Sequence, residues 1–255
     1  GGNYDWRSEF EFGWEMVDRQ SSGQLAAVLV EPILSSGGII ELPPGYLGAL
    51  RDKAHERGML LILDEAQTGM GRTGDNFAFE HDEVVPDILC LSKTLGAGLP
   101  FSATVTSAEI EQDCYDKGFL FYTTHAADPL PAIVGAKVVE IVLRDRLALR
   151  AAELGAYLRK HLSVLQQRHA IIGDLRGRGL LQGVELVLDR QNKTPASDLG
   201  MKVSRRCLEL GACLNIGRRN TASVFRIAPP LTVSREEIDR AVAIYDQALS
   251  EIVGL

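Results

Sequence analysis

The sequence predicts an α/β protein with a mostly parallel β-sheet that helices cover on both faces. Short, continuously apolar segments recur at residues 25–30, 59–63, 87–91 and 101–106. Runs without polar alternation are typical of strands that are buried on both faces. A helical pattern separates the first two segments, and this alternation of strand and helix favours parallel strands in one sheet.

The helix between the first two strands is expected to follow the Pro43-Pro44-Gly45 turn and to end near Gly58. Its apolar face would consist of Tyr46, Leu47, Leu50 and Ala54. The second strand leads directly into Asp64, and the third leads into Ser92 and Lys93. In an open parallel sheet, ligands bind beyond the carboxyl ends of the strands, so Asp64 and Lys93 lie at the expected ligand edge.

The second half of the chain has a different pattern. A long helical stretch follows Pro131 and is expected to be interrupted at residues 144–146. Beyond it, the predicted elements are strands at 171–175 and 180–186, a helix at 199–210, and strands near Cys213 and Val224. Ser234 and Glu237 have the spacing of a capping box, which would open the last helix. We place a domain boundary near residue 143, which divides the chain into residues 1–143 and 144–255.

The composition excludes several classes of function. The 255 residues carry a net charge of −7 without a basic stripe, so we expect no nucleic-acid partner. No apolar run reaches the roughly 18 residues that a membrane span needs, and no signal peptide is visible, so no membrane association is expected. The four cysteines lack metal-like spacing and are predicted to be reduced thiols of a cytoplasmic protein.

Asp64 and Lys93 have the chemistry that an aldehyde cofactor requires. A lysine can anchor such a cofactor as a Schiff base, and a carboxylate can keep its pyridinium nitrogen protonated. Each residue opens or enters a Gly-rich loop that lets the backbone approach a ligand closely: DEAQTGMGRTG at 64–74 and SKTLGAGLP at 92–100. Taken alone, the lysine could be solvated and the aspartate could be a helix cap.

These motifs resemble those of the class III (subgroup II) aminotransferases, which are pyridoxal-phosphate (PLP) enzymes of fold type I. The resemblance is carried by DEAQTGMGRTG at 64–74, PDILCLSK at 86–93 and TLGAGLP at 94–100. It continues in EPILSSGGIIELP at 31–43, GDLRGRGLLQGVEL at 173–186 and FRIAPPLTVS at 225–234. It implies that residues 1–143 are the C-terminal part of the large, mainly parallel PLP-binding domain. Residues 144–255 would be the small C-terminal α/β domain.

The resemblance implies four cofactor-binding residues. Lys93 would form the Schiff base and shuttle protons, Asp64 would pair with the pyridinium nitrogen, and Gln67 would bond to the cofactor's phenolic oxygen. Thr124 would contact the cofactor phosphate of a neighbouring subunit, which implies a homodimer or a dimer of dimers. Without the family, Thr124 could be an ordinary loop hydroxyl.

Arg226 and Ser36 are the residues that the resemblance assigns to the substrate carboxylate. The planar guanidinium of arginine suits a carboxylate because it can donate two parallel hydrogen bonds. Without the family, a simple pair between Arg226 and a surface acid would be the favoured interpretation. The implied small-molecule partners are an amino acid and a keto acid.

Asp128 favours one branch of the family. Typical class III aminotransferases have Asn before the proline that follows here, whereas the branch that decarboxylates 2,2-dialkylglycines has Asp. With the main chain around Thr124 and Ala126, Asp128 would contribute to an alkali-metal site for K⁺ or Na⁺, for which oxygen ligands are suitable. The family's N-terminal portion has no counterpart in the sequence, so the chain is expected to be the C-terminal part of a longer enzyme.

The leading functional hypothesis is therefore PLP-dependent decarboxylation of a 2,2-dialkylglycine, coupled to transamination of a keto acid such as pyruvate. One alternative is a class III transaminase that acts on an ω-amine or an amino acid without decarboxylation. Another is an inactive fragment or pseudo-enzyme module. The absence of an N-terminal portion favours this last alternative, and the intact Lys93, Asp64 and Gln67 oppose it.

Overall fold

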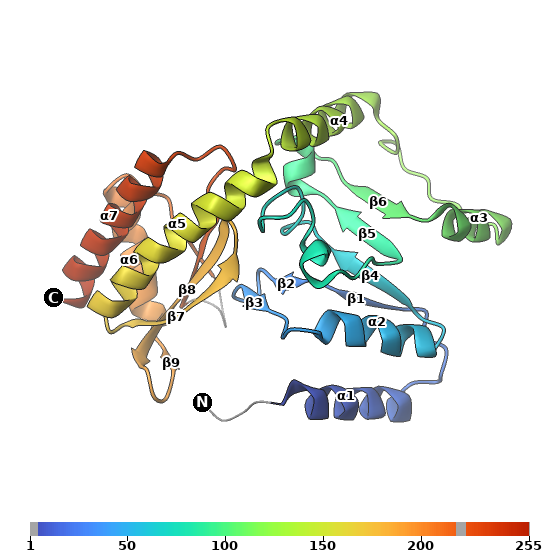
Figure 1. The fold of residues 1–255 in the computed structure, drawn as a ribbon, viewed down its shortest axis with the longest axis horizontal. Helices are drawn as coiled ribbons and strands as arrows, with labels where there is room; N and C mark the ends of the chain where they lie inside the picture. The colour runs from blue at the N-terminus through green and yellow to red at the C-terminus, as the bar shows by residue number, and fades with distance from the viewer. Residues whose placement is uncertain (1–4, 218–222, 255) are drawn as a thin grey trace.

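The computed structural model describes residues 5–217 and 223–254, which form two main β-sheets with helices packed around them (Figure 1). The first sheet has the order β1-β4-β5-β6, formed by Ala27–Val30, Leu60–Asp64, Ile88–Leu91 and Ala103–Thr106. β1, β4 and β5 are parallel, as the sequence predicts, whereas β6 runs antiparallel to β5. An apolar run indicates a strand but not its direction, which is why the reversal at β6 was not predicted.

Two helices, α1 (Trp6–Gln20) and α2 (Tyr46–Glu56), lie on one side of this sheet (Figure 1). α2 has the predicted bounds, and Gly45 caps it in a left-handed conformation. α1 was not predicted, although it buries the aromatic side chains of Trp6, Phe10 and Trp14. Their four-residue spacing is a helical signal. The ring of Tyr46 on α2 lies 5.2 Å from the ring centroids of both Trp6 and Phe10, so the two helices pack through aromatic contacts.

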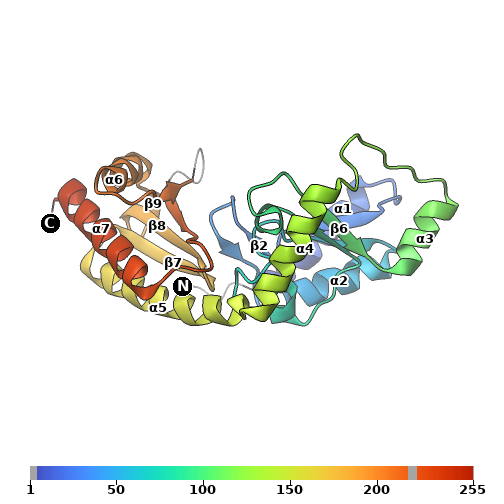
Figure 2. The same cartoon turned by 90° about the horizontal axis from the view of Figure 1, so that it is seen from above.

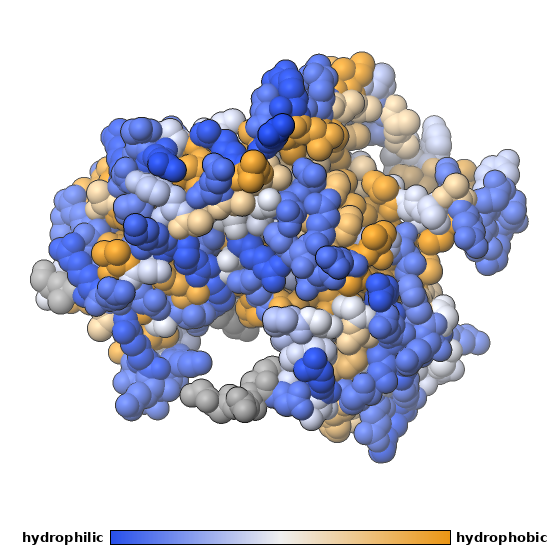
Figure 3. Space-filling view, in the orientation of Figure 1, coloured by the Kyte–Doolittle hydropathy of each residue, from blue (hydrophilic) through white to orange (hydrophobic). Residues whose placement is uncertain are grey.

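The other side of the first sheet is only partly covered in the described part of the chain. α4 (Pro129–Arg144) packs against η2 (Lys93–Gly96), a short 3-10 helix, and α3 (Ala108–Asp116) follows β6. Leu29 on β1 and Val105 on β6 nevertheless remain 63% and 49% exposed. Figure 3 shows apolar residues gathered over the region of β5, β6 and α4. The expectation of a sheet covered on both faces is therefore wrong for this chain by itself.

The second sheet is antiparallel and has the order β10-β11-β8-β7. Its strands are Asn215–Ile216, Val224–Ile227, Leu181–Asp189 and Ile172–Arg178, and β9 (Thr194–Pro195) pairs with β8. The helices α5 (Leu147–Arg168), α6 (Ser197–Glu209) and α7 (Arg235–Val253) pack together on one side of it (Figure 2). The predicted capping box is present, because Ser234 and Glu237 bond reciprocally to each other's backbone N–H groups at the start of α7.

The chain passes between the two sheets at Asp145 and Arg146, where α4 ends and α5 begins. Arg146 has a left-handed φ of 51°, which breaks the helix at the predicted interruption. Buried apolar side chains form one continuous cluster from Leu61 and Leu63 through Val142 to Phe225. The division into two domains near residue 143 stays a prediction. No helix in the described ranges is long and apolar enough to cross a bilayer.

A short hairpin lies between the two sheets. Its strands are β2 (Ile33–Leu34) and β3 (Ile40–Glu41), and it contacts β7 of the second sheet through β3. The sequence did not predict this hairpin, because two-residue strands have no periodicity to detect. Its turn carries Ser36, one of the residues assigned to the substrate carboxylate.

Candidate active site

Asp64 and Lys93, the predicted cofactor residues, follow two neighbouring parallel strands. β4 and β5 pair in register, with the Cα atoms of Asp64 and Cys90 opposite each other. The backbone N–H of Glu65 donates to the carbonyl of Cys90 at 2.9 Å, which holds the two strand ends together. Lys93 follows β5 after Ser92, at the start of η2, and its side chain is exposed. The two residues therefore share the ligand-binding edge that the sequence predicts.

The carboxylate of Asp64 is half-buried and remains available for a ligand. One of its oxygens accepts a hydrogen bond from the backbone N–H of Ala66 at 2.9 Å, and this bond closes the first turn of the loop. The pKa of the Cys90 thiol is raised above its ordinary value, mainly by burial and further by the negative charge of Asp64. The carboxylate is therefore close enough to a neighbouring strand to act electrostatically on it.

Lys93 has a left-handed backbone conformation, with a φ of 51°. A residue with a β-carbon rarely adopts this conformation, and such positions cluster at functional sites. Among the described residues, its ammonium group has no hydrogen-bond or ion-pair partner. The amine is therefore accessible at the sheet edge rather than occupied by a structural contact.

Glu65, next to Asp64, is the residue that holds the Gly-rich loop, and it was not predicted. Its carboxylate is almost fully buried and accepts from the backbone N–H groups of Ala78 and Phe79 at 2.7 and 2.9 Å. The hydroxyl of Thr68 also donates to it at 3.0 Å. Burial raises the pKa of Glu65, and these three donors oppose that shift. Gln67 lies on this loop and is half-buried.

The donor set at this edge fits PLP. An accessible primary amine can bind an aldehyde, a half-buried carboxylate can face a ring nitrogen, and a half-buried amide can reach a phenolic oxygen. Gly69 lets the backbone of the same loop fold tightly, because a β-carbon there would meet the carbonyl oxygen of Glu65 at 3.0 Å. Lys93, Asp64 and Gln67 are thus the residues that would hold the cofactor.

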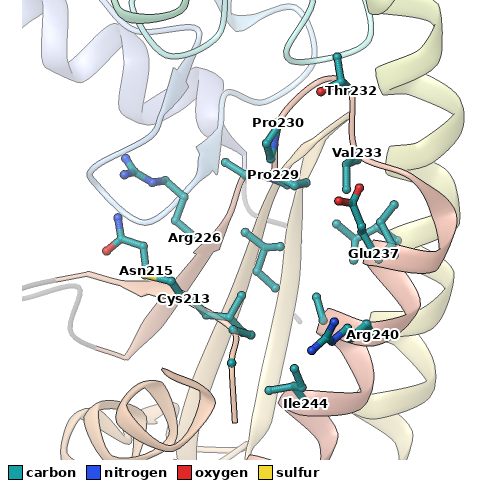
Figure 4. Close-up of a pocket in the computed structure, with 18 residues that line it drawn as sticks. Cys213, Asn215, Arg226, Pro229, Pro230, Thr232, Val233, Glu237, Arg240 and Ile244 are labelled. Atoms are coloured by element: carbon teal, nitrogen blue, oxygen red, sulfur yellow. The ribbon is translucent and has the colours of Figure 1, made fainter. Parts of the chain in front are cut away.

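Ser36 and Arg226, which are predicted to bind the substrate carboxylate, line one hollow of about 420 Å³ between the hairpin and the second sheet. Ser36 is exposed on the hairpin turn, and Arg226 is half-buried on β11. Figure 4 shows the side chains of Arg226 and Asn215 pointing to the same side, away from α7. In the part of the chain that is described, the guanidinium of Arg226 has no acidic or hydrogen-bonding partner. The surface ion pair that was its alternative role is not formed there.

A second, larger hollow of about 730 Å³ adjoins the first and shares Asn215 and Arg226 with it. It lies between β11 and α7, and Glu237 and Arg240 of α7 reach its rim (Figure 4). Arg226 therefore stands between the two hollows.

Arg72 connects the Gly-rich loop at residues 64–74 to the turn between β7 and β8 and to the segment that follows β11. One of its Nη atoms donates to the carbonyls of Pro229 and Leu180 at 2.5 and 3.3 Å. The backbone N–H of Leu180 donates back to the carbonyl of Arg72 at 3.0 Å. Burial lowers the pKa of this guanidinium below its ordinary value. Arg72 is in the predicted Gly-rich loop, but nothing in the motif indicates that it crosses to the second sheet.

The predicted alkali-ion ligands lie in a separate, exposed segment. Thr124 and Ala126 are exposed, and Asp128 is half-buried at the start of α4. The carboxylate of Asp128 lies 3.4 Å from Nδ1 of His125. Among the described residues, no group of three or more His, Cys, Asp or Glu side chains could hold a metal ion. The alkali-ion site at Thr124, Ala126 and Asp128 stays a prediction.

The comparison with protein families decides the family. The model of the class-III aminotransferases matches residues 4–249. The chain belongs to the class-III aminotransferase family. An uncharacterized aminotransferase of Schizosaccharomyces pombe is 55% identical over 250 residues, which are 98% of this chain and 56% of that protein. The mitochondrial alanine–glyoxylate aminotransferase 2 homolog 2 of Arabidopsis thaliana is 37% identical over 93% of this chain and 49% of its own.

The fold of this class-III chain is shared with solved structures. The thermostable (S)-enantioselective omega-transaminase of Thermomicrobium roseum superposes with a TM-score of 0.86 at 34% identity. The match covers 94% of this chain and 54% of that protein. The expected fold class, an α/β fold of type I PLP enzymes, is therefore confirmed. The chain spans about half the length of the relatives that it matches.

Proposed function

We propose that this chain is the part of a PLP-dependent transaminase that supplies the cofactor-binding lysine. The whole enzyme would act on an amine or an amino acid. The observation that supports this most strongly is the pairing of β4 with β5, which brings Asp64 and Lys93 to one sheet edge. The transaminase alternative is preferred to decarboxylation, since the relatives named above are described as aminotransferases or transaminases.

The proposed chemistry divides the work among a few side chains. PLP, when bound, supplies an electron-accepting ring that stabilises the carbanion formed at the substrate's α-carbon. Lys93 would anchor the cofactor and then move a proton at that carbon through its Nζ atom. Asp64 would keep the ring nitrogen protonated, and Gln67 would orient the ring through its phenolic oxygen. Arg226 and Ser36 would hold the substrate carboxylate in the hollow that they line.

Several finer hypotheses remain separate proposals. Decarboxylation of a 2,2-dialkylglycine and an alkali ion at Asp128, Thr124 and Ala126 rest on the sequence resemblance, and no step of the mechanism depends on either. A phosphate contact from Thr124 requires a neighbouring subunit, so the homodimer or dimer of dimers is proposed with it. Cytoplasmic location likewise stays a prediction.

The test is amino-group transfer by the complete protein. Loaded with PLP, it should transfer ¹⁵N from a labelled amino acid or amine to a keto acid such as pyruvate. The same protein should be given 2-aminoisobutyrate, with carbon dioxide release measured. Transfer without carbon dioxide would support the transaminase, and carbon dioxide release coupled to transfer would restore the decarboxylase. If PLP binds but neither product forms, the hypothesis of an inactive module would be supported.

Arg226→Lys tests the proposed carboxylate site. Because an ammonium group cannot donate two parallel bonds from a fixed plane, the KM for an α-amino acid donor should rise by about tenfold or more. The KM for an amine without a carboxylate should change much less. Steady-state kinetics with alanine and with a simple arylalkylamine make the comparison, and equal increases for both donors would exclude a carboxylate clamp.

A further inference from the structure

The β2–β3 hairpin is attached to the second sheet by polar contacts from Glu41 at its base and from Gly38 in its turn. One carboxylate oxygen of Glu41 accepts from the backbone N–H of Gly177 at 2.7 Å, and the other accepts from Nε of Arg178 at 2.8 Å. In the turn of the hairpin, the carbonyl of Gly38 accepts from Nε of Arg176, also on β7, at 2.7 Å. The hairpin that carries Ser36 is thus fixed to β7 at two points.

An apolar contact completes the attachment. Ile39 is fully buried, with a left-handed φ of 57°. It packs on Gly177 and Gly183, where a β-carbon would come within 2.9 Å of Ile39 atoms in both cases. Only glycine admits such a close approach, so the two glycines form the seat for this side chain.

The seat adjoins the strand that carries the proposed substrate arginine. Gly183 on β8 is the direct partner of Arg226 on β11 and of Arg176 on β7. Ile39 also lines the same 420 Å³ hollow as Ser36 and Arg226. The position of the hairpin on the sheet therefore determines the separation between the Ser36 wall and the Arg226 wall of the hollow.

We propose that Glu41 is a positioning residue for substrate selection: by holding the hairpin on Gly177 and Arg178, it sets the width of the hollow that receives the substrate carboxylate. The proposal rests on the proposed function, since it assigns this hollow to the carboxylate of an amino donor. Glu41 does not itself line the hollow, so its effect would pass through Ser36.

Glu41→Gln is a mild change that should leave the fold intact. The side chains of Glu41 and Arg178 are 30% and 32% exposed, and ion pairs of this kind contribute little to global stability. Glu251→Gln is a matched control, because Glu251 pairs with Arg206 between α6 and α7, away from the hairpin. Both variants lose one carboxylate and one ion pair to arginine.

The kinetic test uses the complete holoenzyme. In Glu41→Gln, the KM for an α-amino acid donor should rise about tenfold, while kcat and the KM for a carboxylate-free amine stay within about twofold. Glu251→Gln should change none of these. Arg178→Gln should reproduce the effect of Glu41→Gln, and the double variant should lose no more than either single one. Equal effects on both donors, or the same effect in the control, would overturn the proposal.

A second measurement does not depend on activity. Hydrogen–deuterium exchange of the amides at residues 33–41 should become faster in Glu41→Gln and stay unchanged in Glu251→Gln. Unchanged exchange in Glu41→Gln would overturn the attachment itself. A third outcome separates this proposal from the proposed function. If exchange is faster in Glu41→Gln but Arg226→Lys raises the KM of both donors equally, the attachment of the hairpin is real. The assigned carboxylate site, and with it the role of Glu41 in substrate selection, would then be refuted.

Discussion

The Cys90 thiol lies next to Asp64, so its pKa depends on the charge at the proposed cofactor site. The two residues are partners across β4 and β5, and the negative charge of Asp64 adds to burial in raising the pKa of the Cys90 thiol. Since the thiolate is the reactive form, Cys90 is a natural probe of the charge that would face the ring nitrogen.

Removing that charge should be measurable without any cofactor. Asp64→Asn should lower the pKa of Cys90, which would still exceed the ordinary value of 9.0 because burial is the larger cause. The pH dependence of Cys90 alkylation, followed by peptide mass spectrometry, gives the pKa directly. Asp52→Asn, at an exposed residue paired with Arg51, should have no effect. An unchanged Cys90 profile in Asp64→Asn would contradict the electrostatic contact.

Among single residues, the sequence was sufficient to predict the positions of side chains that directly follow strands. It was insufficient to predict contacts between residues that are distant in sequence. Asp64 and Lys93 each follow an apolar run, so the rule for parallel sheets brings them together. Glu41 and Arg178 are 137 residues apart, and no local pattern indicates that they meet. The buried Glu65 could have been suspected, because an acid beside an apolar strand needs partners.

At the scale of elements, the Gly-rich loop and the second sheet are joined by Arg72. Its guanidinium spans from the loop after β4 to the carbonyls of Leu180 and Pro229, which belong to the β7–β8 turn and to the segment after β11. Gly179 lies in the same turn, and a β-carbon there would meet the carbonyl carbon of Thr73 at 2.5 Å. These contacts hold the Gly-rich loop of residues 64–74 against the β7–β8 turn and the segment after β11.

Arg72→Ala should destabilise the protein by about 3 kcal/mol. The variant loses hydrogen bonds from a charged donor and leaves two backbone carbonyls without this partner. Arg144→Ala is the control, because Arg144 is exposed and pairs only with its neighbour Asp145 among the described residues. The control should lose no more than about 0.5 kcal/mol. The free energy of unfolding is measured for both variants by denaturant titration. Similar losses in both would show that Arg72 does not join the Gly-rich loop to the second sheet.

Elements with a clear hydrophobic period were predicted well, and those defined by long-range contacts were not. The helices α2 and α7 have complete apolar faces and cap signals, so their bounds follow from the sequence. The hairpin and the direction of β6 depend on pairing partners that are distant in sequence. α1 could have been found from the spacing of Trp6, Phe10 and Trp14.

At the scale of the whole molecule, the segment between α3 and α4 exposes an unusual run of large apolar side chains. Leu120 and Tyr122 are 85% and 83% exposed, and Phe119 and Phe121 are 67% and 69% exposed. Soluble monomers rarely leave such groups in water unless another surface covers them. The segment leads into Thr124, which is proposed to reach a neighbouring subunit.

The 255-residue chain should therefore self-associate through this segment. Replacing Phe119 and Phe121 together with Ser should shift its average mass in sedimentation velocity towards the monomer, because about 300 Å² of aromatic surface is removed. Leu188→Ser, at an isolated exposed leucine on β8, should leave the mass unchanged. An unaltered mass in the double variant would mean that association occurs elsewhere, for example at the exposed strand edges.

Lys93 is proposed to bind the cofactor through its side-chain amine, and chemical trapping of that bond tests the assignment. The complete protein is incubated with PLP, reduced with borohydride, digested and analysed by mass spectrometry. We expect a pyridoxyl adduct on the peptide that contains Lys93, and no adduct on that peptide in Lys93→Ala. An adduct that forms instead on Lys53 or Lys137, with Lys93 unmodified, would contradict the account.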